Sequence, residues 1–170
     1  MSIAERLTEH VIRLRRYALV LCRERDDAEE LVQECLAKAL ASADTFRRDA
    51  DLRAWLFGIL HATYVGSARR FQRRVRAAEA VAAADPDIVP PAQIQRSELA
   101  AALRALAQLP EEQRQVLALI VIEGMTYEEA ADILAIPVAT VMARLGRGRE
   151  RLRQLMGDGR GGRVQVVRSP

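Results

Sequence analysis

The sequence has few of the residues that build disulfide scaffolds, metal sites and membrane helices. Its two cysteines, Cys22 and Cys35, belong to no CxxC or Cys/His cluster, so we expect buried thiols rather than a disulfide or zinc ligands. No run approaches the ~18 apolar residues of a membrane helix. The N-terminus carries acidic residues where a signal peptide needs a basic and then an apolar stretch. These absences predict a cytoplasmic protein without membrane insertion.

Residues suited to catalysis are equally scarce. His10 and His61 are the only histidines, and they lie far apart in the sequence. Neither has paired carboxylates, metal-ligand spacing or a phosphate-binding glycine loop nearby. The sequence therefore predicts a protein that is not an enzyme, with no catalytic residues, no cofactor, no metal and no small-molecule substrate.

Lysine is almost absent, because Lys38 stands alone beside 25 arginines. The net charge of +3 in 170 residues is too small to indicate a nucleic-acid partner by itself. The charge is unevenly distributed, however. Its net value is +4 over residues 1–78, −2 over 79–97, −1 over 98–157 and +2 over 158–170. The distribution is therefore more informative than the total.

Apolar residues recur at helical spacing almost everywhere, and no stretch keeps the alternation of a strand for long. This pattern predicts an all-α fold. We expect a first helix over residues 3–23 and a second capped by Asp26, with Glu29 in capping-box position. A third helix is expected over 52–76.

A change of composition divides the chain. Residues 77–97 are rich in alanine and then interrupted by proline (DPDIVPPAQ), which disfavours helix. The predicted organisation is two small helical domains, over 1–76 and 98–156, joined by a flexible linker at 77–97. A glycine- and arginine-rich flexible tail follows at 157–170.

The strongest local signal runs from Thr126 to Arg153. Thr126 and Glu129 form a capping box that opens a short helix, and a three-residue turn then leads into a long helix. This is the spacing of a helix-turn-helix, whose second helix enters the major groove of DNA. We expect its first turns to contact bases and its later arginines to contact phosphates. The predicted DNA contacts are Ala139, Thr140, Ala143, Arg144, Arg147, Arg149 and Arg151.

The first domain carries a different set of signals. Asp27, Glu30 and Glu34 are spaced to share one outer helix face, which suits a basic partner. Six of the seven aromatic residues of the chain lie in this domain, where they serve as core or stack on unpaired bases. Five arginines in eight residues, from Arg69 to Arg76, indicate phosphate binding.

The order of these features resembles the extracytoplasmic function (ECF) group of bacterial sigma factors. The resemblance rests on DDAEELVQECLAKAL (26–40), the F-x-x-x-x-x-L-R-A-W-L-F stretch (46–57), LPEEQRQVLALIVIEGMTYEEAADIL (109–134) and IPVATVMARLGRGRERL (136–152). It implies sigma region 2 in the first domain and sigma region 4 in the second. The implied partners are core RNA polymerase, promoter DNA and an anti-sigma factor.

The resemblance also implies which residues bind. The polymerase would dock on Asp27, Glu30, Leu31, Gln33 and Glu34. The minus-ten element would contact Arg53, Trp55, His61, Tyr64, Arg69, Arg70, Arg73 and Arg74. The minus-thirty-five element would contact the predicted DNA residues of the helix-turn-helix.

Two alternatives stay open. Ala62 and Gly66 stand where Asn and Asp are common in the family, which is compatible with a sigma-like decoy that binds an anti-sigma factor but no promoter. A stand-alone helix-turn-helix regulator would explain the second domain but not the acidic helix.

Overall fold

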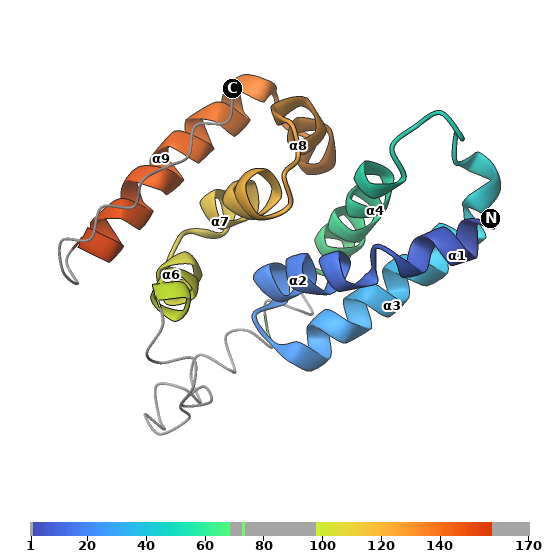
Figure 1. Ribbon diagram of the computed structural model, residues 1–170, viewed down its shortest axis with the longest axis horizontal. Coiled ribbons are helices and arrows are strands. Elements are labelled where there is room, and N and C mark those ends of the chain that lie inside the picture. Colours follow the sequence, from blue (N-terminus) through green and yellow to red (C-terminus); the bar gives the residue numbers. More distant parts are fainter. Residues whose placement is uncertain (1, 69–72, 74–97, 158–170) are drawn as a thin grey trace.

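The computed structural model describes residues 2–68, 73 and 98–157, and this part of the chain is helical with no β-strand (Figure 1). The all-α prediction is confirmed. We call residues 2–68 the first half and 98–157 the second half. In chain order the elements are α1 (Ile3–Thr8), α2 (Val11–Cys22), α3 (Arg25–Ala41), the 3-10 turn η1 (Ala43–Thr45), α4 (Leu52–Gly66), α6 (Glu98–Ala107), α7 (Glu111–Leu117), the π-helical turn η2 (Ala118–Ile122), α8 (Tyr127–Leu134) and α9 (Val138–Gly157).

The expected single helix over 3–23 is wrong, since the chain breaks between α1 and α2. The backbone N–H of His10 donates to the carbonyl of Leu7 at 3.0 Å, an i→i+3 bond that interrupts the regular i→i+4 pattern. Both pieces keep an apolar face, because Leu7 and Leu14 are buried on either side of the break. The helical period predicted for residues 3–23 is therefore present, but it is interrupted between Thr8 and Val11.

The start of the second predicted helix is also different, because Glu24 rather than Asp26 caps α3. Arg23 ends α2 in the left-handed conformation (φ 57°) and leaves Glu24 as the extended residue between the two helices. The Glu24 carboxylate accepts hydrogen bonds from the backbone N–H groups of Asp26 and Asp27 at 3.0 and 2.8 Å. Either acid could cap a helix start by its chemistry, and the backbone angle selects Glu24.

The third predicted helix is shorter than expected. Asp51 caps α4 by accepting from the N–H of Arg53 at 2.9 Å, and the helix ends at Gly66 with Ser67 as its C-cap. A continuous helix to residue 76 is therefore wrong. Apart from Arg73, residues 69–97 lie outside the described part of the chain, and so do the predicted linker and nearly all of the predicted tail.

The helix-turn-helix prediction is confirmed. Thr126 and Glu129 form the capping box of α8, each side chain accepting from the other's backbone N–H. Ala135 ends α8 in the left-handed conformation (φ 53°), and the turn through Pro137 leads into α9. Before α8, Gly124 has φ +67°, which explains why a glycine closes the preceding turn.

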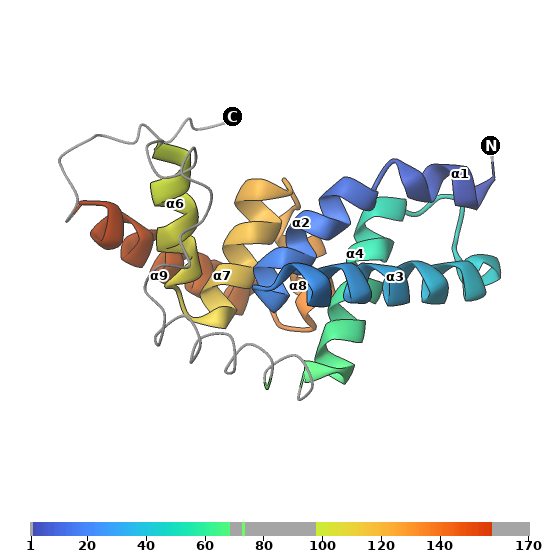
Figure 2. The same ribbon diagram turned by 90° about the horizontal axis from the view of Figure 1, so that it is seen from below.

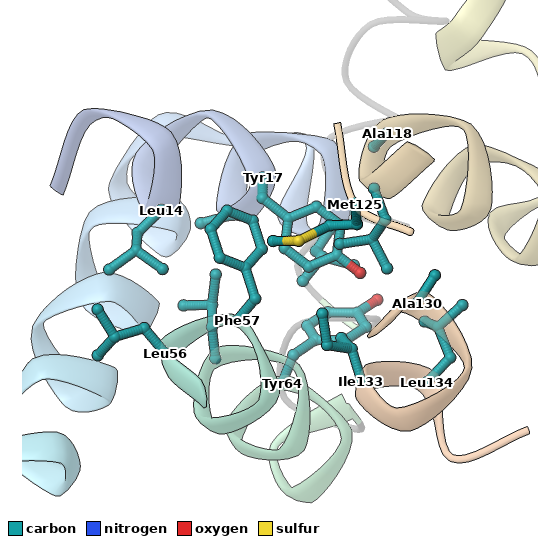
Figure 3. Packing of buried hydrophobic residues seen from close by; sticks show 14 of the residues in the cluster. Leu14, Tyr17, Leu56, Phe57, Tyr64, Ala118, Met125, Ala130, Ile133 and Leu134 are labelled. Atoms are coloured by element: carbon teal, nitrogen blue, oxygen red, sulfur yellow. The ribbon is translucent and has the colours of Figure 1, made fainter. Parts of the chain in front are cut away.

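One apolar core runs through both halves, with α7 packed on α2 and α8 on α4 (Figures 1 and 2). Figure 3 shows Met125 beside Tyr17 and Phe57, and Ile133 beside Tyr64. The rings of Tyr17 and Phe57 are 5.4 Å apart between centroids. We call this packing of the second half on the first the closed arrangement. Within the described ranges, no helix is long and apolar enough to cross a membrane.

Candidate nucleic-acid and polymerase interfaces

The outer face of α9 is fixed by what the helix buries. Val141 and Leu145 are fully or almost fully buried, and Gly148 lies against α7, where an added Cβ would come within 3.0 Å of Leu117 Cδ1. With these positions facing inward, the opposite side of the helix is turned to solvent. The exposed residues of α9 are Ala139, Met142, Ala143, Gly146, Arg147, Arg149, Glu150, Arg151, Arg153, Gln154 and Gly157.

The predicted phosphate-binding arginines lie on this solvent side. Arg147, Arg149 and Arg151 are exposed, and Arg147 donates to the carbonyl oxygen of Ala143 at 3.4 Å. The neighbouring acid, Glu150, is paired with Arg153. Because this ion pair balances the one acid on the face, the charge of α9 toward solvent is positive.

Arg144 lies differently from the other predicted DNA contacts. Its side chain is only 22% exposed, and Arg144 Nη2 lies 3.6 Å from Glu112 Oε1 at the start of α7. Thr140 is half-buried as well. Contact of Arg144 with a base stays a prediction that requires release of Glu112.

The acidic face of α3 is smaller than predicted. Asp27 is only 2% exposed, so its predicted place on the outer face is wrong. It shares the inward stripe of Leu31 and Cys35 at spacings of four residues, and Leu31 is fully buried too. Exposed or half-buried polymerase-docking candidates remain at Glu30, Gln33 and Glu34.

Two of the acidic side chains of α3 form ion pairs with nearby basic residues of the same chain. Glu34 pairs with Lys38 at 3.0 Å, and Glu29 pairs with Arg15 of α2 at 2.9 Å. Exposed ion pairs of this kind contribute little to stability, so both acids remain available to a basic partner.

Two of the predicted minus-ten residues, Arg53 and Tyr64, contact the second half. Arg53 Nη1 donates to the carbonyl oxygen of Glu123 at 3.2 Å, and Arg53 Nη2 lies 3.8 Å from Glu129 Oε2 of α8. Tyr64 is buried and donates its hydroxyl hydrogen to Glu111 of α7. Burial and this acidic partner raise the pKa of Tyr64.

The other members of this set differ in exposure. His61 is buried, and its Nδ1 lies 3.2 Å from the hydroxyl oxygen of Tyr17, a buried core residue outside this set. Burial lowers the pKa of His61 to about 4, so the ring is neutral at pH 7. Trp55 is half-buried against Phe46, with ring centroids 4.9 Å apart. Arg73 is exposed, while Arg69, Arg70 and Arg74 lie outside the described residues.

Polar contacts that the sequence did not reveal hold the halves together. Arg16 of α2 binds Glu123 at 2.6 Å, and this carboxylate is almost completely buried. Arg114, also buried, donates to the carbonyl oxygens of Val20 and Leu109 at 3.1 Å each. In the sequence, Glu123 is the single acid at the end of the apolar stretch ALIVIE. This position indicates a buried carboxylate, and a buried carboxylate needs a charged or hydrogen-bonding partner.

Both cysteines are buried free thiols, as predicted. Burial raises the pKa of Cys35 to about 12. In the part of the chain that the structure describes, no group of three or more His, Cys, Asp or Glu side chains is arranged to hold a metal ion.

Comparison with protein families matches both halves. The family model "Sigma-70, region 4" matches residues 99–152, and "Sigma2 domain of PhyR" matches residues 7–61. The ECF RNA polymerase sigma factor EcfG of Rhodopseudomonas palustris is 35% identical over 155 residues, which cover 91% of this chain and 85% of EcfG. SigM of Mycobacterium tuberculosis is 30% identical over 87% of this chain and 74% of SigM.

Solved structures agree with these relatives. The sigma factor RpoE of Bartonella quintana, in complex with the anti-sigma factor NepR, superposes with a TM-score of 0.74 at 33% identity, covering 93% of this chain and 98% of RpoE. CnrH in complex with the cytosolic domain of CnrY gives a TM-score of 0.68 at 27% identity, covering 92% of this chain and 88% of CnrH. Since the similarity extends through both helical halves, the chain belongs to the ECF family of RNA polymerase sigma factors.

Proposed function

We propose that this chain is the promoter-recognition subunit that a bacterial RNA polymerase uses to start transcription at a defined set of genes. It binds core RNA polymerase and promoter DNA, acts with them in the cytoplasm, and has no catalytic activity of its own. The observation that carries the proposal is the outer face of α9. There, arginines and short side chains are exposed on a helix whose opposite side is locked against α7.

Arg147, Arg149 and Arg151 serve as the phosphate contacts that position α9 in the major groove. Each phosphate contact releases counterions, so the logarithm of the binding constant falls with the logarithm of salt concentration by about 0.9 per contact. The base contacts come from the first two turns of the helix, which include Ala139 and Ala143.

The polymerase docks on the exposed part of α3, at Glu30, Gln33 and Glu34. Charge complementarity with a basic polymerase surface favours this face, because no basic residue other than Lys38 lies within residues 26–46. Asp27 and Leu31 support the face from beneath through the packing of α3 rather than by contact with the partner.

Promoter binding requires the closed arrangement to open. Arg53 and Tyr64 contact the second half, so neither reaches a minus-ten element until that half moves away. RpoE of Bartonella quintana is described in complex with the anti-sigma factor NepR. We propose that an anti-sigma factor likewise restrains this chain, by holding both halves together.

Reconstituted transcription tests the proposal. Core polymerase with the purified chain should start transcripts at discrete sites of the source genome, and sequencing of the 5′ ends should reveal two shared upstream elements. Two double variants separate the proposed surfaces. Glu30→Arg with Glu34→Arg should weaken polymerase binding, whereas Arg149→Ala with Arg151→Ala should leave polymerase binding intact and weaken promoter binding. Absence of any defined start site would refute the proposal.

One alternative function has a specific observation in its favour. Residues 7–61 match the Sigma2 domain of PhyR, and PhyR of Bartonella quintana is described as an anti-anti-sigma factor in complex with NepR. A protein of that kind would bind an anti-sigma factor and support no initiation. The transcription reaction discriminates directly, since a decoy gives no start sites and does not need the arginines of α9.

A further inference from the structure

The first two turns of α9 present an apolar surface to solvent. Met142 is 54% exposed, although it is a large apolar side chain. Its exposed neighbours Ala139 and Ala143 are short, and Gly146, one turn further on, has no side chain. Met142 is therefore the longest side chain on this part of the outer face.

The orientation of Met142 follows from the packing of α9. Val141 and Leu145 are buried on the side toward the other helices, and Gly148 has no room for a side chain against Leu117. The helix consequently cannot rotate to bury Met142 without exposing these residues. Figure 1 shows α7 lying between α9 and the first half, so the outer face of α9 points away from the other described helices.

The polar side chains near this surface are less exposed than Met142. Thr140 is half-buried, and Arg144 lies beside Glu112. The part of α9 that would meet the base edges thus offers mainly apolar atoms. Among the groups that base pairs display in the major groove, the 5-methyl group of thymine is the apolar one.

We propose that Met142 is a specificity-determining residue that packs on a thymine methyl group in the promoter element read by α9. Ala139 and Ala143 allow the helix to approach the bases closely enough for this contact, and Gly146 removes any side chain from the next turn. This inference rests on the proposed promoter-recognition function. It assigns the readout of at least one A·T pair to shape and apolar contact rather than to a hydrogen bond.

Replacement of thymine by deoxyuridine tests the contact, because it removes only the methyl group. The probes are promoter duplexes found by transcript mapping, with one thymine of the upstream element replaced at a time, bound to polymerase carrying the full chain. At one or two positions, wild-type binding should weaken about three- to fivefold, the effect expected for one lost methyl contact. Met142→Ala should bind both versions equally, and Met142→Leu should keep most of the difference.

Matched controls separate this inference from the function on which it depends. Val121 is 58% exposed and lies in η2, so Val121→Ala should keep the full thymine dependence. Initiation by the wild type without any thymine-methyl dependence would overturn the role of Met142 and leave the proposed function standing. Unchanged methyl dependence in Met142→Ala would also overturn it. Failure of the wild type to initiate at all would refute the proposed function itself.

Discussion

Two glycines in α9, Gly146 and Gly148, should respond differently to substitution by alanine. Gly146 is exposed, and an added Cβ would meet no atom within 4 Å. Alanine is about 1 kcal/mol more favourable than glycine inside a helix, so Gly146→Ala should stabilise the protein by about that amount. For a protein of this size, that corresponds to a rise in Tm of about 2–4 °C.

Gly148→Ala gains the same helix propensity but meets the core. Its Cβ would lie 3.0 Å from Leu117 Cδ1 and 3.3 Å from Gln113 Cβ. Leu117 is buried and has little space to move, and α7 would have to shift away from α9. Overpacking of this kind costs about 1–3 kcal/mol, which cancels or exceeds the gain in propensity. We therefore expect Gly148→Ala to be less stable than Gly146→Ala by about 1–3 kcal/mol.

Urea unfolding followed by circular dichroism measures both variants against the wild type. A double variant, Gly148→Ala with Leu117→Ala, supplies the internal control, because shortening Leu117 removes the close contact. The alanine at 148 should then be less unfavourable than in the presence of leucine. Equal stabilisation by Gly146→Ala and Gly148→Ala would refute the tight approach of α9 to α7.

Three further outcomes follow from buried groups. His61 has a pKa lowered to about 4 in the folded chain and near 6.5 in the unfolded chain, so the unfolded state binds more protons between these values. The free energy of unfolding should fall by about 3 kcal/mol as pH drops from 6.5 to 4, and pH titration of His61→Gln should lack this contribution. Tyr64→Phe removes the hydrogen bond to Glu111 and should lower the unfolding free energy by about 1–3 kcal/mol, measured by urea unfolding at pH 7. Cys22 and Cys35 should resist iodoacetamide in the native protein and react after denaturation, as followed by mass spectrometry, because both are buried and the pKa of Cys35 is raised to about 12.

Local sequence signals predicted a helix start correctly where only one residue was suited to cap the helix. Thr126 and Glu129 are the capping pair of α8 in the structure, as their spacing indicated. At the start of α3, the sequence predicted Asp26 as the cap, and the left-handed conformation of Arg23 makes Glu24, two residues earlier, the cap instead. Sequence spacing alone does not contain that backbone angle.

The closed arrangement could not be predicted in the same way. Helical periodicity indicates which face of a helix is apolar but not which helix will cover it. At 3.6 residues per turn, the buried positions of α4 cover about half of the helix circumference. They are Leu52, Leu56, Phe57, Leu60, His61, Thr63 and Tyr64. That breadth was a signal for cover on more than one side, and the second half supplies it.

The candidate DNA face of α9 also combines features that the sequence predicts with features that depend on packing. The exposed arginines of α9 followed from charge and spacing, whereas the positions of Arg144 and Met142 depended on the rotation of the helix. Val141, Leu145 and Gly148 set this rotation by packing against other elements. Packing within the second half thus determines which side chains of α9 face solvent.

The contacts of Arg53 with Glu123 and Glu129 make the second half an internal competitor for the DNA that this arginine is proposed to bind. The apparent dissociation constant for DNA equals the intrinsic constant divided by the fraction of molecules that are open. A substitution that weakens the interface, and touches no DNA contact, should therefore raise promoter affinity until the open state predominates. A restraining protein needs only to lower the open fraction, and so could inhibit transcription without covering a single base-reading residue.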